Sequence, residues 1–127
     1  MLELTVGVNW PAVALGTVLS FGLSMLWFSP RMFGKGWSRG SHILQPPATL
    51  PLAAMLTQFI GTALMAWIIG VTAVANALAT AFLVILAIAV LQLAAGLFSQ
   101  KSRYAALVDS GYVVAMGALM IFAQAIL

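Results

Sequence analysis

Four long runs of apolar residues divide the chain, and each is long enough to cross a lipid bilayer. The runs cover residues 10–28, 52–69, 77–98 and 104–126. A helix needs about 20 apolar residues to span the hydrocarbon core. Open strands would leave backbone groups unpaired in lipid, and residues 81–91 lack the alternation of a barrel strand. The sequence therefore predicts an all-α integral membrane protein, with four transmembrane helices forming two antiparallel hairpins in a single domain, 1–127.

The segments between the runs contain residues that end helices. Ser29-Pro30 closes the first run, because proline cannot continue the hydrogen-bond ladder and disfavours α conformation in the residue before it. Gly70 is expected to end the second helix, with an uncharged turn from Val71 to Asn76 before the third. The connection 29–50 is the longest, and 99–103 joins the last two runs.

Charge adds an orientation to this arrangement. Only 6% of the residues are charged, against about 25% in soluble domains, so lipid must be the main solvent. All five cations lie in the first and third connections, and the opposite end has Glu3 without lysine or arginine. The positive-inside rule then predicts a multi-pass inner-membrane-type protein, with both basic connections in the cytoplasm and both termini outside.

The first basic connection has a helical pattern. Arg31, Lys35 and Arg39 recur at every fourth residue, while Phe33 and Trp37 fall on the other side of a helical wheel. Such a segment suits the headgroup layer, with its cations toward anionic lipids, although its glycines weaken a helix. It is either an ordinary positive-inside loop with an aromatic anchor or a specific lipid-headgroup or partner site. The candidate residues for that site are Arg31, Lys35, Arg39, Trp37, Lys101 and Arg103.

Asp109 is the one charged residue well inside a predicted span. An ionised aspartate at the centre of a membrane helix costs about 2.5–3.5 kcal/mol, and less near the edge. Such a residue normally faces other helices or water and has a partner. The expected partners are Arg31, Lys101 and Arg103, which reach in from the same interface.

Counting depth from the cytoplasmic helix ends groups further polar residues with Asp109. Ser24, Gln58 and Gln92 lie at similar depths on the first three helices, and Ser110 and Tyr112 follow Asp109 on the fourth. Two interpretations are open. The layer is a hydrogen-bond network that fixes packing, at about 0.6 kcal/mol per bond, or a water-accessible vestibule with Asp109 as an ion or substrate site.

Small residues recur at four-residue spacing on three helices. They are Gly16, Ser20 and Ser24, then Thr57 and Gly61, then Gly111 and Ala115. These faces allow close helix packing, either within the bundle or in a homo-oligomer.

The composition provides few of the side chains that catalysis or metal binding requires. There is no cysteine, His42 is the only histidine, and Glu3 and Asp109 are the only acids. Catalytic triads, carboxylate pairs and metal-ligand sets are therefore not expected, nor is a phosphate-binding loop. We expect no enzyme, no cofactor and no metal. Five cations give no indication of a nucleic-acid partner.

The end of the first helix carries a resemblance to a known family. The residues are Asn9-Trp10, Trp27-Phe28-Ser29-Pro30, Phe33-Gly34-Lys35 and Trp37, with the later Gly111-Tyr112. The chain resembles a bacterial family called domain of unknown function 1761. The resemblance implies a small four-span protein of the bacterial cytoplasmic (inner) membrane, without an assigned activity. Phe28 stands where tyrosine is expected. Val113 stands where histidine is frequent, so any chemistry of that histidine would be missing here.

The sequence favours a small structural or accessory membrane protein that assembles with itself or with a larger membrane complex. The alternative is a small homo-oligomeric transporter or channel that uses Asp109 and the polar layer, namely Gln58, Gln92, Ser24 and Tyr112. The expected partners are membrane lipids, further copies of the chain or other membrane proteins.

Overall fold

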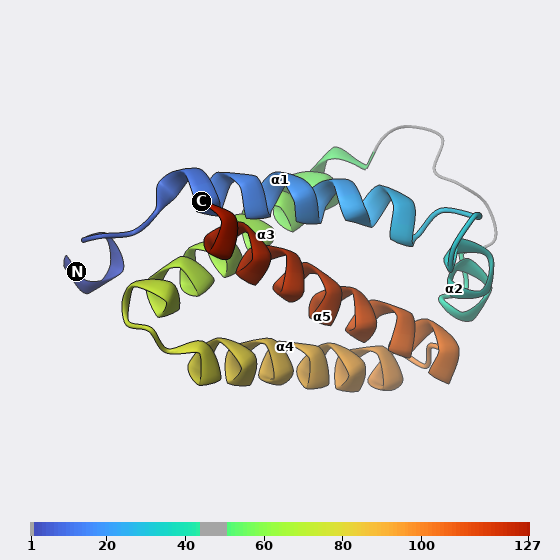
Figure 1. Ribbon diagram of the computed structural model, residues 1–127. Helices are drawn as coiled ribbons and strands as arrows, with labels where there is room; N and C mark the ends of the chain where they lie inside the picture. Colours follow the sequence, from blue (N-terminus) through green and yellow to red (C-terminus); the bar gives the residue numbers. More distant parts are fainter. Residues whose placement is uncertain (1, 44–50) are drawn as a thin grey trace.

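The computed structural model of the protein describes residues 2–43 and 51–127, and it is helical over most of that length (Figure 1). A 3-10 turn, η1 (Leu2–Leu4), precedes α1 (Trp10–Trp27), α2 (Gly34–Gly40), α3 (Leu52–Val74), α4 (Leu78–Phe98) and α5 (Arg103–Ile126). No strand occurs in the described ranges. Helices α1, α3, α4 and α5 are each long and apolar enough to cross a membrane. The predicted all-α fold with four spans is confirmed.

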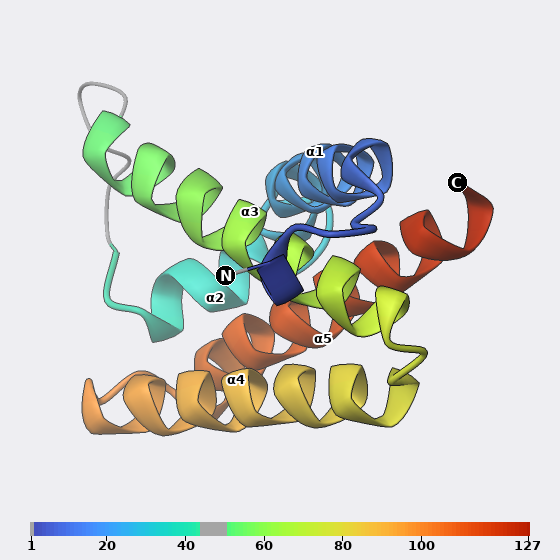
Figure 2. The same ribbon diagram turned by 90° about the vertical axis from the view of Figure 1, so that its left-hand side faces the viewer.

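Helix α5 is the centre of the bundle. Helices α1 and α3 pack as one antiparallel pair, α4 and α5 as another, and α5 also contacts α1, α2 and α3 (Figures 1 and 2). Half of the apolar window of α5 is buried inside the chain, compared with 22–28% for the other three spans. Most of the surface of α1, α3 and α4 is therefore left for lipid or for a partner.

Small residues allow α5 to approach its neighbours closely. A Cβ on Gly16 of α1 would lie 3.3 Å from the Met120 backbone, and a Cβ on Gly117 would lie 2.6 Å from Ile85 of α4. The buried Ser20 hydroxyl donates to the Met116 carbonyl at 3.4 Å. Gly16 and Ser20, the first two small residues of the α1 pattern, therefore face α5 within the same chain. By contrast, a Cβ on Gly61 of α3 would meet no atom within 4 Å.

The second membrane helix is longer than the sequence suggested. The prediction that Gly70 ends it is wrong, because α3 continues through Val71, Thr72 and Ala73 to Val74. The turn follows at residues 75–77, where Asn76 adopts a φ of 52°. Gly70 is buried, and a Cβ there would lie 2.9 Å from a methyl group of Val13. Its glycine lets α1 and α3 approach; it does not end the helix.

The first basic connection contains an element of its own. Helix α2 lies against the α4–α5 connection and the start of α5. A Cβ on Gly36 would come within 2.5 Å of the Tyr104 ring, and the Gly40 carbonyl accepts from the Ser102 amide at 3.0 Å. The glycines that weaken this helix in isolation therefore permit its close docking. Residues 44–50 of the connection lie outside the described residues.

The ends of the bundle differ in charge. All five cations lie at one end, in α2, its approach, the α4–α5 connection and the first residue of α5 (Figure 1): Arg31, Lys35, Arg39, Lys101 and Arg103. Both termini and the α3–α4 turn lie toward the other end, where Trp10 packs on Trp67 with ring centroids 5.5 Å apart. We call the first end the basic end.

Candidate functional site

Asp109 is held by two side chains at the basic end. Its Oδ1 accepts from the Trp37 indole Nε1 at 2.8 Å, and its Oδ2 forms an ion pair with Lys101 Nζ at 2.6 Å. The aspartate is 7% exposed. Of the three expected partners, Lys101 is the one in contact, while Arg31 and Arg103 have exposed side chains. Both carboxylate oxygens are therefore engaged, and the pair carries no net charge.

The α4–α5 connection positions Lys101 for this contact. Gln100 adopts a φ of 62°, and the Lys101 amide donates to the Gly96 carbonyl at 3.0 Å, which reverses the chain tightly after α4. Ser102 then caps α5, with its Oγ accepting from the Ala105 amide at 3.0 Å. Lys101 Nζ also lies 5.7 Å from the centroid of the Trp37 ring, within the range of a cation–π contact.

Trp37 belongs to a cluster of aromatic side chains that ties α1 and α2 to α5. Its ring lies 4.7 Å from Phe28, which lies 5.4 Å from Tyr112, both measured between centroids. Trp27 donates from its indole to the Val108 carbonyl at 3.0 Å. The sequence suggested that Trp37 contacts lipid headgroups or a partner. In the structure the indole N–H of the half-buried Trp37 donates to Asp109.

A cleft of about 990 Å³ opens beside Asp109, between α1, α3, α4 and α5. Figure 2 shows α3 and α4 diverging toward the basic end, where this cleft lies. All five residues predicted as a possible ion or substrate site line it: Ser24, Gln58, Gln92, Asp109 and Tyr112. Ser110 does not, because its hydroxyl donates to the Ala89 carbonyl of α4 at 2.9 Å.

The two glutamines occupy opposite walls of the cleft and are both exposed. The Tyr112 hydroxyl donates to the Ser20 carbonyl at 2.6 Å, and Gln58 lies beside it on α3. The Gln92 side chain, on α4, makes no hydrogen bond to any described residue. An amide side chain offers two donor hydrogens and two acceptor lone pairs, so both glutamines retain free hydrogen-bonding capacity.

Gln58, Gln92 and Asp109 share one depth. Each lies six residues from the helix end at the basic end, counted from Leu52, Phe98 and Arg103. At about 1.5 Å per residue, each is about 9 Å inside the bundle. Farther in, the lining becomes apolar, with Met65, Ile88 and Met116. Gln58, Gln92 and Asp109 therefore share one level of the cleft, and apolar side chains make up much of the lining farther in.

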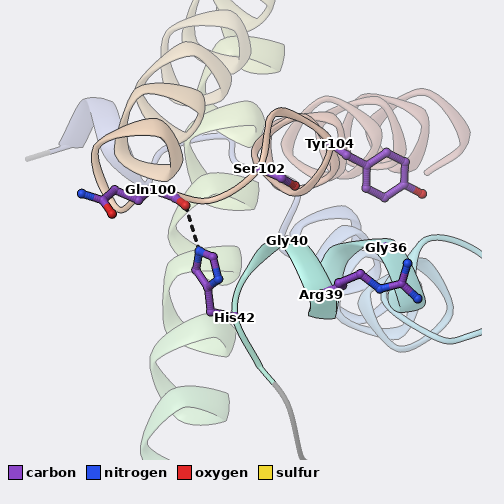
Figure 3. A pocket seen from close by; sticks show the side chains of 7 residues that line it. All are labelled: Gly36, Arg39, Gly40, His42, Gln100, Ser102 and Tyr104. Atoms are coloured by element: carbon purple, nitrogen blue, oxygen red, sulfur yellow. Dashed lines mark hydrogen bonds between the residues drawn. The ribbon is translucent and has the colours of Figure 1, made fainter.

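A second, smaller hollow of about 430 Å³ lies on the surface between α2 and the α4–α5 connection (Figure 3). His42 Nε2 lies 2.9 Å from the Gln100 carbonyl at one side, and the Arg39 side chain extends along the other, toward Tyr104 (Figure 3). Arg31, Lys35 and Arg103 line neither hollow. The predicted headgroup residues are thus spread over the basic end and not gathered in one site.

Sequence reasoning missed part of the cleft. Thr57 and Thr62 also line it, on the same helix as Gln58. Thr62 follows Gln58 by four residues and so lies on the same face of α3, a spacing that could have identified it. Thr57, adjacent to Gln58 in sequence, carries no such signal. No group of three or more potential metal-ligating side chains occurs among residues 2–43 and 51–127.

Comparison with known proteins gives a family and no more. No curated protein and no solved structure matches the chain. A family model described as "Protein of unknown function (DUF1761)" matches residues 11–123, which cover nearly all of the four spans and every residue that lines the cleft. The chain belongs to this family.

Proposed function

We propose that the chain acts by binding an occupant in its cleft within the membrane, as a small accessory or binding protein and not as an enzyme. The observation that carries this proposal is the pair of glutamines on facing walls, α3 and α4. Their amides lie at membrane depth with hydrogen-bonding capacity left over. The remaining hydrogen bonds of these amides must be made with water, a ligand or another chain.

The energetics favour a specific occupant. A polar group taken into an apolar medium without a hydrogen bond costs about 1–3 kcal/mol in proteins. Polar residues inside membrane spans normally face a bundle interior or an aqueous cavity. Gln58 and Gln92 face an open cleft whose deeper lining is apolar. An occupant that bonds to both amides would remove this cost.

Assembly with a partner is supported by the surface of α4. This helix packs mainly on α5, and its outer side presents Leu83, Leu86 and Leu91 with exposed fractions of 57–70%. In the accessory role, this face would contact lipid, a further copy or a larger complex.

A transporter is the second candidate, favoured by the gathering of five predicted polar residues in one cleft. The ion pair argues against Asp109 as its cation site. A cation would have to displace Lys101, which binds Asp109 at 2.6 Å. The binding role requires no such displacement.

We further propose that the basic end faces the cytoplasm, which the positive-inside rule supports. Since the chain has no cysteine, single cysteines at Glu3 and Arg103 give clean labels. With intact cells, a membrane-impermeant maleimide should label Glu3→Cys and leave Arg103→Cys unlabelled until the membrane is opened. The reverse pattern would refute the orientation.

Filling the cleft tests the binding role. Gly61 lines the cleft and Gly22 lies outside it, and a Cβ on either would meet no atom within 4 Å. Gly61→Trp should therefore fold and block the cleft, while Gly22→Trp is the matched control. In native mass spectrometry of chain extracted gently from membranes, we expect Gly61→Trp to lose the co-purifying mass and Gly22→Trp to keep it. Equal retention by both variants would show that the cleft is not the binding site.

A further inference from the structure

We propose that the occupant of the cleft is an uncharged amphiphile, whose polar head bonds to Gln58 and Gln92 and whose hydrocarbon tail lies on Met65, Ile88 and Met116. The head both donates and accepts hydrogen bonds, as a glycerol ester, a long-chain alcohol or a fatty amide does. This inference rests on the proposed binding function and names the ligand class for it.

Charge is the first reason. Among the described residues that line the cleft, Asp109 is the one charged side chain, and Lys101 neutralises it. Its two oxygens already accept from Trp37 and Lys101. An anionic head would approach a carboxylate, and a cationic head would compete with a lysine already in place. An uncharged head meets neither penalty and finds two amides with hydrogen-bonding capacity left over.

Depth is the second reason. The glutamines lie about 9 Å inside the helix ends, whereas the free cations Arg31, Lys35 and Arg103 are exposed at the surface of the basic end. A phospholipid would keep its phosphate at that surface, near water and the cations. Its phosphate would then sit well above the amides. A head that descends to the amides must enter the edge of the hydrocarbon, which a neutral head does at much lower cost than a charged one.

Shape is the third reason. The cleft volume of about 990 Å³ lies at the upper end of the range of small-molecule sites, roughly 300–1,000 Å³. Met65 follows Gln58 by seven residues on α3, so the apolar part extends about 10 Å below the amides. The α3 wall has small, exposed residues: Ala53 and Ala54 near its start, and Gly61 just beyond Gln58. An amphiphile from the bilayer can enter sideways there, with its tail still in hydrocarbon.

The test uses the purified full chain with three probes that share one 18-carbon tail: monoolein, oleate and oleylamine. Of the four tryptophans, Trp37 lines the cleft, so the fluorescence change in detergent micelles that is lost in Trp37→Phe reports occupancy. Native mass spectrometry gives the stoichiometry. We expect monoolein to bind one per chain and at least tenfold more tightly than either charged probe.

A composition-matched variant tests the amides. Leu91, beside Gln92, is 70% exposed and does not line the cleft. Exchanging the two residues (Leu91→Gln with Gln92→Leu) moves the amide outward without changing hydrophobicity. Since a hydrogen bond is worth about tenfold in affinity, the exchange should weaken monoolein binding about tenfold, and adding Gln58→Leu should weaken it further. The single variant Leu91→Ala should bind as the unaltered chain does.

The outcomes separate this inference from the function on which it rests. Equal or tighter binding of oleate or oleylamine would overturn the uncharged ligand and keep the cleft as a binding site. If no probe binds, and Gly61→Trp releases a co-purifying protein, the occupant is a partner chain and the amphiphile is ruled out. If Gly61→Trp releases nothing and no probe binds, both proposals fail.

Discussion

Replacing Lys101 with methionine is expected to destabilise the folded chain by about 3 kcal/mol. The substitution keeps the length and the apolar stem of the side chain but removes the charge that pairs with Asp109 at 2.6 Å. Asp109 is 7% exposed and fixed on a membrane-spanning helix, so it cannot turn to bulk water. An unpaired buried charge is the costly product of breaking such a pair. Unfolding by SDS titration in mixed micelles measures the change.

The opposite substitution should cost much less. In Asp109→Asn the unpaired charge is Lys101, whose side chain is 26% exposed and sits in the α4–α5 connection. A lysine at the interface can extend its amino group into water. We expect a loss of about 1 kcal/mol, the usual net value of a hydrogen bond. Combining Asp109→Asn with Lys101→Met should recover most of the stability lost in Lys101→Met alone. Equal losses from both single variants would contradict a buried, directional ion pair.

The same Asp109→Asn variant distinguishes the two candidate functions. In reconstituted vesicles, a transporter that uses the Asp109 carboxylate should fold in this variant and lose its flux. A binding protein should keep the cleft and its ligand, because Trp37 and Lys101 occupy the Asp109 oxygens in the unaltered chain. If the unaltered chain and Asp109→Asn both keep the ligand and neither produces a flux, the binding function is supported.

The membrane spans could be predicted because lipid imposes a simple rule. An uninterrupted apolar run of sufficient length becomes a helix, and this rule located all four spans. It did not fix the end of α3. Gly70 looks like a terminator in sequence, but a glycine inside a helix also serves close packing. Its contact with Val13 of α1, 57 positions earlier, is invisible in the local pattern.

The polar layer could be anticipated for a related reason. The rise of a helix is constant, so depth follows from counting, and five polar side chains predicted to share a layer line one cleft. The direction of each side chain around its helix axis depends on tertiary packing. Ser110, adjacent to Asp109, therefore turns to the Ala89 carbonyl and away from the cleft.

The role of Trp37 was beyond local reasoning. Its partner Asp109 lies 72 positions away, and the contact exists only because α2 docks on α5. That docking depends on Gly36 and Gly40, whose missing side chains make room for Tyr104 and Ser102. In sequence, the same glycines only lower the helix propensity of the segment.

Gly34→Ala is expected to destabilise the chain by about 2–3 kcal/mol and to release Trp37 from Asp109. Gly34 is buried at the start of α2, where its amide donates to the Ser29 carbonyl at 2.8 Å. A Cβ there would overlap the Phe28 carbonyl oxygen and lie 2.6 Å from the Ser29 carbonyl carbon. These are backbone atoms of the turn after α1, so no rotamer change can relieve the overlap. The turn must open, and α2 must shift away from α5.

Gly22→Ala is the matched control. Gly22 lies within α1 and is exposed, and a Cβ there meets no atom within 4 Å. This substitution should leave stability unchanged or raise it by up to about 1 kcal/mol, the helix-propensity difference between alanine and glycine. Thermal unfolding in detergent compares the two variants. The Trp37 emission, obtained as the difference from the spectrum of a matched Trp37→Phe chain because the protein has four tryptophans, reports the docking of α2. An unshifted Trp37 emission and unchanged stability in Gly34→Ala would show that the turn does not hold α2 against α5. A lower stability and a shifted Trp37 emission in Gly34→Ala, with both unaffected in Gly22→Ala, would establish that this single glycine couples the first helix to the Asp109 site.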